Sequence, residues 1–471
     1  MKICIIAEGS YPYVTGGVAS WIQMLVTLNP EHEFIVYAIG ACEEIRGRFK
    51  YDIPRNVIEV KEFFLDSYAK YSGGWGKRFN LTNEEKEALK GLIIGSGFRW
   101  GELFKLIEKS KYTCVSDFLM SRDFFDIITQ VSEEYYPYMV FNDFFWTVRS
   151  MLLSLLEVLK NSIPYADIYH SVSTGYAGVV AALGKHKYGS PVVLSEHGIY
   201  TREREEEIIK SDWVKGYLKD IWIKYFYSLS SCAYTYADKV VSLFDRNKRI
   251  QIEMGCDKNK ISIIPNGISS SDFIDIDRTK DNEEIINIGA VVRIVPIKDI
   301  KTIIQGFAIA AEKLKNIKLY ILGPEDEDKT YTDECKLLVE SLNLDNVTFT
   351  GQVNIKDYIG KMDILVLGSI SEGQPLAVLE GMAAGKPHIL TDVGSCRELM
   401  YGNNDGFGEA GIVIPVMDYE ALGASIVTLS KNKPLRDKLG KSAHKRVSKL
   451  YTIDNFISGY KRIYEEVVRN K

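Results

Sequence analysis

The stretch SEGQPLAVLEGMAAGKP, residues 371–387, decides the fold of this chain because a loop changes there into an apolar helix. The preceding run DILVLG (363–368) predicts a buried strand. Pro375 suits the first helical position, where the N–H that proline lacks would have no partner. Gly385 predicts the end of the helix one residue earlier. A strand, a short loop and a helix in this order indicate a parallel α/β unit.

Glu380 is the one charged residue inside the predicted helix. It shares a helix face with Leu376, Ala383 and Ala384, and every other residue from 376 to 384 is apolar or glycine. A helix that is apolar all round is expected to be buried, and an ionised carboxylate there needs a partner. That partner is either an arginine or lysine of the chain or a ligand, and the vicinal hydroxyls of a ribose fit two carboxylate oxygens.

The loop before the helix carries a second acid, Glu372, at the carboxyl end of the strand. It is either a solvated loop residue or a ligand-facing carboxylate. The backbone amides of Gly373, Gln374 and Leu376 lie at the expected helix N-terminus. They are therefore candidates to hold sugar hydroxyls or phosphate oxygens.

Strand-like apolar runs alternate with helix-like runs in both halves of the chain, which indicates parallel sheets with crossover helices. The runs of the first half are KICIIA (2–7), FIVYAI (34–39), ADIYHS (166–171), PVVLSE (191–196), ADKVVSL (237–243) and KISIIPNG (260–267). Those of the second half are INIGAVV (286–292), KLYILG (318–323), NVTFTG (346–351), DILVLG (363–368) and HILTDVG (388–394).

We therefore predict two Rossmann-like open α/β domains that face each other across a cleft. The first comprises residues 1–275, with a mostly helical insertion over about 60–165, where the alternation stops. The second comprises residues 276–451, and the C-terminal helix, 452–471, is expected to join the first domain. In open α/β sheets, ligands bind beyond the carboxyl ends of the strands, so residues just after each strand are the candidates for a site.

Three other strand ends carry residues that suit a phosphorylated ligand. Arg293 and Lys298 follow INIGAVV. The planar guanidinium of Arg293 and the mobile ammonium group of Lys298 suit the oxygens of a diphosphate, unless both side chains are simply solvated. Gly16 and Gly17 follow the first strand and would let a ligand approach the backbone closely, unless the loop is a plain connection. His197 stands at the end of PVVLSE, either facing the ligand or serving as a structural histidine.

The spacing of Glu372 and Glu380 in the setting E-G-x-P-L-x-x-L-E-x-M-A-x-G-x-P resembles retaining glycosyltransferases of family 4, which have the GT-B fold. The matching residues are Glu372, Gly373, Pro375, Leu376, Leu379, Glu380, Met382, Ala383, Gly385 and Pro387. The family also has a G-R-(x)-x-x-x-K-G loop. Here residues 290–292, AVV, precede Arg293, and Asp299 replaces the glycine after Lys298.

This resemblance implies roles for the candidate residues. Glu380 would bind the ribose of a sugar nucleotide, and Glu372 would face the donor sugar. His197 would lie beside the reacting sugar, and Gly16 and Gly17 would lie near the donor phosphates and the acceptor.

The resemblance further implies that Arg293 and Lys298 stabilise the leaving diphosphate in a retaining hexosyltransferase that needs no metal and no resident cofactor. The segments EGSYPYVTGGVASW (8–21), SEHGIYTRER (195–204) and SEGQPLAVLEGM (371–382) resemble members that act in Pel-type exopolysaccharide synthesis for biofilms. That implies a UDP-sugar donor such as UDP-glucose and a polysaccharide acceptor. It also implies a cytoplasmic protein recruited to the inner face of the membrane beside an export complex.

Bulk composition agrees with an ordinary globular enzyme. The chain has 471 residues, 63 acidic and 58 basic, and a net charge of −5, so no overall basic field indicates nucleic acid. Seven scattered cysteines without a C-x-x-C pair favour a reducing compartment over a disulfide framework. The apolar segment 139–159 is interrupted by Asp143, Arg149 and Glu157, which predicts a buried or partner-facing helix rather than a membrane span.

Other enzyme classes fit the sequence less well. A metal-dependent GT-A transferase needs an Asp-x-Asp motif, and Asp275 and Asp277 have that spacing but lie in the linker expected at 270–284. A glycosidase would use Glu372 and Glu380 as acid and nucleophile, which the burial expected of Glu380 disfavours. A non-hydrolysing sugar-nucleotide epimerase of GT-B architecture and an inactive nucleotide-sugar-binding component stay open as alternatives.

Overall fold

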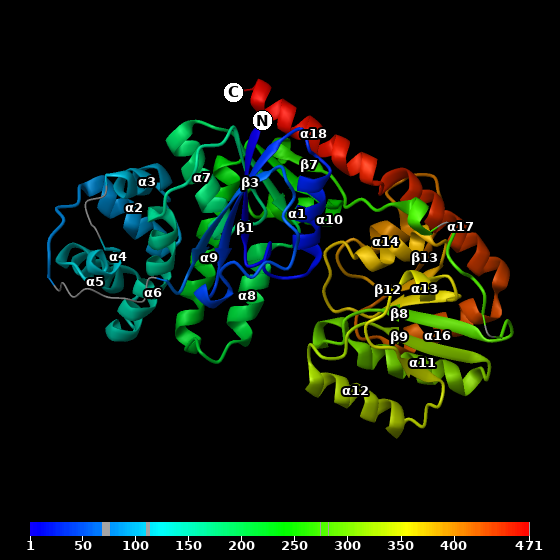
Figure 1. The fold of residues 1–471 in the computed structure, drawn as a ribbon. Coiled ribbons are helices and arrows are strands. Elements are labelled where there is room, and N and C mark those ends of the chain that lie inside the picture. Colours follow the sequence, from blue (N-terminus) through cyan, green and yellow to red (C-terminus); the bar gives the residue numbers. More distant parts are fainter. Residues whose placement is uncertain (68–75, 110–113, 274, 281, 471) are drawn as a thin grey trace. The chain divides into compact units, whose positions relative to one another are not determined.

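The computed structural model describes residues 1–67, 76–109, 114–273, 275–280 and 282–470, which form two compact units. Unit 1 comprises residues 1–242, 247–263 and 459–471, and unit 2 comprises residues 243–246 and 264–458. Each unit has its own apolar core. Each contains an open parallel sheet with helices packed against it (Figure 1), which confirms the predicted fold class.

Unit 1 is built on a sheet in the order β3-β2-β1-β4-β5-β6-β7, and every adjacent pair of described strands is parallel. The strands are β1 (Lys2–Glu8), β2 (Glu33–Gly40), β3 (Val57–Phe64), β4 (Ile168–Ser171), β5 (Val192–Glu196), β6 (Lys239–Ser242) and β7 (Ile261–Ile263). The strand order reverses between β1 and β4, so the loops after these two strands border the switch point where such sheets bind ligands.

The helices that follow these strands are α1 (Gly17–Thr27), α2 (Asn83–Ile94), α3 (Trp100–Glu108), α4 (Val115–Phe118), α5 (Arg122–Tyr135), α6 (Phe141–Lys160), α7 (Tyr176–Tyr188), α8 (Tyr200–Lys210), α9 (Lys219–Tyr236) and α10 (Asp245–Glu253). Short 3₁₀ turns are η1 (Glu43–Ile45), η2 (Gly216–Leu218) and η3 (Lys258–Lys260). Helices α2 to α6 form the predicted helical insertion. Residues 68–75 and 110–113 of that segment lie outside the described residues.

The start of the insertion at residue 60 was wrong, because residues 57–64 form strand β3. This strand pairs with β2 only and lies at the edge of the sheet. Its charged residues Glu59, Lys61 and Glu62 hide the apolar pattern of a strand. Charges of this kind are typical of edge strands, where they prevent pairing with another chain.

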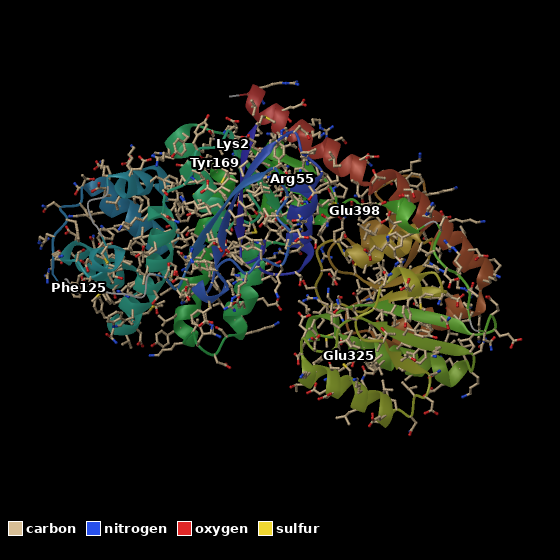
Figure 2. The ribbon with its side chains drawn as sticks, in the orientation of Figure 1. Lys2, Arg55, Phe125, Tyr169, Glu325 and Glu398 are labelled. Atoms are coloured by element: carbon tan, nitrogen blue, oxygen red, sulfur yellow. The ribbon has the colours of Figure 1, made fainter. Side chains whose placement is uncertain are left out.

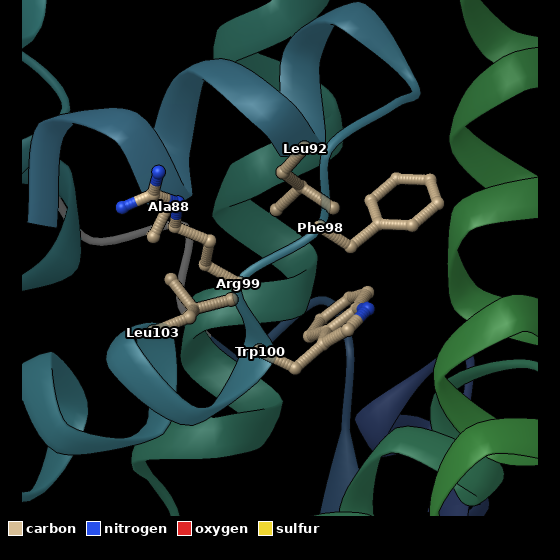
Figure 3. Close-up of a pocket in the computed structure, with 6 residues that line it drawn as sticks. All are labelled: Ala88, Leu92, Phe98, Arg99, Trp100 and Leu103. Carbon is tan, nitrogen blue, oxygen red and sulfur yellow. The ribbon is translucent and has the colours of Figure 1, made fainter. Parts of the chain in front are cut away.

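Helix α6 contains most of the apolar segment 139–159, which the sequence predicted to be a buried or partner-facing helix. One face of α6 is buried in unit 1. Among the described residues, no helix is long and apolar enough to cross a bilayer. The insertion is rich in aromatic residues, and Phe125 marks its position in Figure 2, away from Tyr169 in the sheet. The close-up in Figure 3 shows Leu92 of α2, Phe98 and Trp100 gathered at the seam between α2 and α3.

Unit 2 is built on a sheet in the order β10-β9-β8-β11-β12-β13, again with parallel pairs throughout its described strands. The strands are β8 (Ile286–Val291), β9 (Ile317–Leu322), β10 (Val347–Phe349), β11 (Ile364–Leu367), β12 (His388–Thr391) and β13 (Gly411–Ile414). The order reverses between β8 and β11, so these neighbours form the switch point of unit 2.

The helices of unit 2 are α11 (Ile300–Lys313), α12 (Lys329–Ser341), α13 (Lys356–Ile359), α14 (Leu376–Ala383), α15 (Cys396–Tyr401), α16 (Tyr419–Lys431) and α17 (Lys433–Leu450). Two 3₁₀ turns, η4 (Ser270–Phe273) and η5 (Pro296–Lys298), accompany them. In the loop after β9, the Glu325 carboxylate labelled in Figure 2 accepts a hydrogen bond from Lys336 of α12 at 2.5 Å.

The C-terminal helix α18 (Ile453–Arg469) ends in unit 1, where its tyrosines join a buried polar network. The hydroxyl of Tyr464 lies 2.7 Å from His170 Nδ1, and Ser195 Oγ lies 2.8 Å from His170 Nε2. Tyr460 completes the network at 3.0 Å from Ser195 Oγ. Burial lowers the pKa of His170 to about 3, so its ring is neutral at pH 7. Both ring nitrogens have hydrogen-bond partners.

Arg446 of α17 is the largest fully buried polar side chain of unit 2, with a side-chain exposure of 0%. Its guanidinium binds both carboxylate oxygens of Asp405 at 2.6 and 3.0 Å. It also donates to the carbonyls of Leu399, Met400 and Gly408. The hydrogen bonds from Arg446 hold the pKa of Asp405 below its usual range.

Replacing Asp405 with asparagine is expected to lower the free energy of unfolding by about 3–5 kcal/mol, because it leaves the buried Arg446 charge uncompensated. Since folding depresses the pKa of Asp405, its contribution is complete above the unfolded pKa near 4 and is lost as the pH falls below it. Urea unfolding at pH 7 and at decreasing pH measures both effects. Asp345→Asn, at an exposed position, is the control, and equal stabilities of the two variants at pH 7 would contradict the assignment.

Candidate active site

The candidate site of unit 2 lies where the loops after β8 and β11 meet at the switch point. The first loop carries Arg293 and Lys298, and the second carries Glu372. The two loops are joined by a backbone hydrogen bond from Ile370 N to Ile297 O at 2.9 Å. The fold therefore brings together residues more than 70 positions apart in the sequence.

Lys298 and Glu372 form an ion pair, with Nζ 2.5 Å from Oε1. Their side chains are 17% and 10% exposed, so the pair is largely shielded from water. Ser369 Oγ donates to the same carboxylate oxygen at 2.7 Å. Lys298 was predicted to bind a diphosphate. In the structure its charge is neutralised by Glu372, the acid predicted to face the sugar.

Arg293 lies in the same loop but has a different partner. Its Nη1 is 2.5 Å from Glu327 Oε1, and both side chains are exposed, at 54% and 42%. Exposed ion pairs contribute little, so this guanidinium can exchange its carboxylate for another anion at small cost. Arg293 and Lys298 thus share a loop and not a common partner.

Helix α14 follows the loop as predicted, with one correction at its start. Pro375 is the residue before the helix rather than its first residue, with an extended ψ of 114°. The helix ends at Ala383, and Gly385 adopts a positive φ of 72°, which glycine adopts without strain. Gly381 permits a close approach to the sheet, because a Cβ there would lie 2.4 Å from Leu365 and 2.5 Å from His388.

Glu380 is half-buried on α14, and no hydrogen bond or ion pair engages its carboxylate among the described residues. Burial raises its pKa, and the charge of Lys356 opposes that shift. The hypothesis of an arginine or lysine partner within the chain is therefore not realised in the described part of the structure. A carboxylate in this state is suited to accept hydrogen bonds from a ligand.

The loop residues predicted to bind the ligand divide into two kinds. The backbone N–H groups of Gly373, Gln374 and Leu376 donate to no acceptor among the described residues. The side chain of Gln374 is held at one end, since its Oε1 accepts from Asn266 N at 2.6 Å. Its Nε2 is buried without a partner among the described residues, so the backbone N–H and the side-chain NH₂ of residue 374 are both unused.

The turn after β12 was not predicted as part of the site. Ser395 N donates to Gly373 O at 3.0 Å, and a Cβ on Gly394 would lie 2.2 Å from that oxygen. This turn supports the loop that carries Glu372. The sequence signal was the strand HILT followed by D-V-G, another strand end at the same edge of the sheet.

In unit 1, Gly16 and Gly17 lie at the start of α1, as predicted. Gly16 directly precedes the helix and Gly17 is its first residue. Both are exposed, and a Cβ on either would meet no atom within 4 Å. Packing within the chain does not require glycine here, whereas close approach of a ligand to the helix N-terminus would.

His197 follows β5, and its ring packs edge-on against Trp21, with ring centres 4.6 Å apart. Its Nε2 is buried and has no hydrogen-bond partner among the described residues. Burial lowers the pKa of His197 to about 4, so the imidazole is neutral at pH 7. In contrast to His170, it has an unused polar atom.

Glu8, at the end of β1, is a half-buried acid that the sequence analysis did not identify. Its carboxylate accepts hydrogen bonds from Ala177 N at 3.1 Å and from the Tyr200 hydroxyl at 3.2 Å. Burial raises its pKa, and these hydrogen bonds oppose the shift. Glu8 fixes the start of α7 at the switch point of unit 1.

Asp275 and Asp277, the Asp-x-Asp alternative, do not assemble a metal site with other acids or histidines. Asp277 lies 3.6 Å from Lys361 and accepts a hydrogen bond from Thr279 N. Across the described residues, no group of three histidine, cysteine, aspartate or glutamate side chains has metal-ligand geometry. All seven cysteines are free thiols.

Comparison with known families decides the identity of the chain. Residues 1–259, more than half of the sequence, match the family described as domain of unknown function DUF3492. The chain belongs to the DUF3492 family. Residues 272–446 of this DUF3492 protein match the family described as glycosyl transferases group 1, so the protein is a glycosyltransferase of GT-B type.

Similar proteins include an uncharacterized glycosyltransferase of Methanocaldococcus jannaschii, 27% identical over 68% of this chain and 81% of its own. The UDP-Gal:alpha-D-GlcNAc-diphosphoundecaprenol alpha-1,3-galactosyltransferase of Escherichia coli is 25% identical over 68% of this chain and 80% of its own. The crystal structure of Anabaena HepE in complex with UDP superposes with a TM-score of 0.62 at 13% identity, covering 99% of this chain and 100% of that chain. This last likeness concerns the fold.

Proposed function

We propose that this DUF3492 protein transfers a hexose from a UDP-sugar to a growing exopolysaccharide, with retention at the anomeric carbon and without a metal ion. The observation that carries the proposal is the carboxylate of Glu380, which has no partner in the described part of the chain and lies on an otherwise apolar helix beside the switch point of unit 2. In this proposal, the two oxygens of Glu380 accept the ribose hydroxyls of the donor.

A UDP-sugar donor is supported by proteins that share the sequence or the fold. The Escherichia coli relative is named for UDP-Gal, and structures of Anabaena HepE hold UDP or UDP-glucose. The amides of Gly373, Gln374 and Leu376 and the side chains of Arg293 and Lys298 would hold the diphosphate. When the diphosphate binds, Lys298 would exchange part of its ion pair with Glu372 for the phosphate oxygens.

The proposed chemistry is a front-face substitution. The bond from the anomeric carbon to the diphosphate oxygen breaks while the acceptor hydroxyl oxygen forms a bond to the same carbon. The leaving diphosphate oxygen takes the proton of that hydroxyl. Arg293 and Lys298 would stabilise the charge that grows on the diphosphate, and Glu372 would orient the sugar.

Unit 1 would supply the acceptor side. His197, with its unused Nε2, would contact the reacting sugar, and Gly16 and Gly17 would let the donor phosphates or acceptor approach α1. We place the functional domains at 1–275 and 276–451, with 452–471 in the acceptor-side domain. The resemblance to the Pel exopolysaccharide glycosyltransferase PelF supports a Pel-type acceptor, a cytoplasmic location and recruitment to a membrane-bound export complex.

Wild-type protein is expected to bind UDP, and Glu380→Ala is expected to weaken that binding about ten- to a hundredfold. Loss of a charged hydrogen-bond acceptor costs roughly 1.5–3 kcal/mol, which corresponds to that range. Calorimetric titration measures the affinity, with Glu340→Ala at an exposed position of α12 as the control. Unchanged affinity in a folded Glu380→Ala protein would contradict the ribose assignment.

Transfer is expected to survive excess EDTA, because Arg293 and Lys298 supply the positive charge that a divalent ion supplies elsewhere. The measurement is release of UDP from UDP-sugars, with and without chelator. An activity that EDTA abolishes and magnesium or manganese restores would instead indicate a metal-dependent enzyme. Donor turnover is measured with and without acceptor. Turnover that depends on the acceptor indicates a transferase, and conversion of the donor sugar without acceptor indicates an epimerase.

His197→Ala is expected to lower turnover by a large factor, about 10²–10⁴-fold, and to leave UDP affinity nearly unchanged. A group that contacts the reacting sugar acts more strongly in the transition state than in nucleotide binding. UDP titration and UDP-sugar turnover on the same folded variant measure the two quantities, with His186→Ala on α7 as the control. Near-normal turnover would assign His197 a structural role beside Trp21.

A further inference from the structure

Helix α17 carries a concentration of positive charge that the proposed site does not use. Its 18 residues, KPLRDKLGKSAHKRVSKL, contain seven lysines and arginines and a single acid, Asp437, in a chain whose net charge is −5. Arg446 and Arg436 are buried, and their guanidiniums bind Asp405 and backbone carbonyls. The remaining charge belongs to exposed lysines.

Four of these lysines form one stripe along the helix. Lys438, Lys441, Lys445 and Lys449 are spaced by three, four and four residues, which places them on one face of α17. All four are exposed, and none forms an ion pair among the described residues. Several exposed lysines on other helices are paired with acids one turn away, as in Lys105–Glu102, Lys210–Glu206 and Lys224–Asp220.

A cavity of about 510 Å³ adjoins this stripe, between α17 and the C-terminal end of α14. Its lining includes the cations Arg278, Lys441 and Lys445 and the side chain of His444, and Asp437 is the one acid among its lining residues. The remaining lining residues, Phe273, Ala383, Ala384, Gly385 and Gly440, are apolar or glycine. Figure 1 shows α17 alongside α14 in unit 2.

Two of these side chains, Arg278 and His444, are held in place by the C-terminal end of α14. Arg278 Nη1 donates to Ala384 O at 3.3 Å, and His444 Nδ1 donates to Ala383 O at 2.8 Å. The remaining guanidinium N–H groups of Arg278 have no acceptor among the described residues. Burial lowers the pKa of neighbouring Lys386 to about 8, and the charge of Arg278 adds to that shift, as expected where positive potential accumulates.

We propose that this surface, the α17 basic face (Arg278, Lys438, Lys441, His444, Lys445 and Lys449), docks the protein onto a membrane rich in anionic lipid, with one lipid phosphate seated in the cavity. A row of unpaired lysines matches a layer of negative headgroups, because long, mobile ammonium groups need no fixed geometry. The cavity adds one positioned donor for a single phosphate, the Arg278 guanidinium.

This inference rests on the proposed synthesis of exopolysaccharide beside a membrane and names the surface that would hold the protein there. It assigns the α17 basic face a task separate from the Glu380 site. Nucleotide binding and membrane docking can therefore fail independently in the same experiment.

The test uses the full chain and sedimentation with vesicles of phosphatidylglycerol and phosphatidylcholine, or of phosphatidylcholine alone. The variant Lys441→Gln/Lys445→Gln removes two cations from the cavity and stripe. The control Lys313→Gln/Lys315→Gln removes two exposed, unpaired lysines of unit 2 and changes the net charge equally. A UDP titration of each protein reports on the nucleotide site separately.

Wild-type protein is expected to bind the anionic vesicles and not the neutral ones. High salt is expected to release it from the anionic vesicles. Each lysine near an anionic surface contributes about fivefold in affinity, so the Lys441/Lys445 variant should bind about 25-fold more weakly. The control should bind like wild type, and all three proteins should bind UDP equally.

Three results would overturn the proposal: no binding of wild type to anionic vesicles, full binding by the Lys441/Lys445 variant, or equal loss in both double variants. Thermal shifts with inorganic phosphate and with heparin complete the test. Stabilisation by either one, without vesicle binding, would identify a soluble phosphate or an acidic polymer as the ligand instead.

Discussion

The ion pair between Lys298 and Glu372 is the contact on which the candidate site depends. It joins the loop after β8 to the loop after β11, and these strands are neighbours because the strand order of unit 2 reverses between them. The same loop leads into α14 and so determines where Glu380 lies. Gly381 lets α14 lie close against β11 and β12, which keeps the helix start at the edge of the sheet.

The acids of this protein differ in a way that separates structure from function. Glu196 in unit 1 is buried and accepts four hydrogen bonds, from Thr174, Tyr200 N, Tyr234 and Gln251. Glu380 has none among the described residues. A buried acid with every lone pair satisfied stabilises the fold, whereas an unpartnered one lowers stability and is retained where a ligand completes it.

Histidines show the same contrast. His170 is enclosed by Tyr464 and Ser195, which satisfy both ring nitrogens, and it connects α18 to the sheet of unit 1. His197 has a buried Nε2 without a partner in the described structure. Both rings are neutral because burial lowers their pKa values, so they differ in hydrogen bonding rather than in charge.

The sequence by itself determined the parallel α/β class, most strands, the helix at 376–383 and the position of Glu380 among apolar residues of that helix, because these follow from local apolar patterns. It did not reveal β13 or β3, whose edge position tolerates Glu59, Lys61 and Glu62. The tertiary structure alone decided that Lys298 neutralises Glu372 and that Gln374 Oε1 binds Asn266, because strand order sets which distant loops meet. It likewise decided that the lysines of α17 border a cavity at the end of α14, since a charged helix shows its partners only once it is packed.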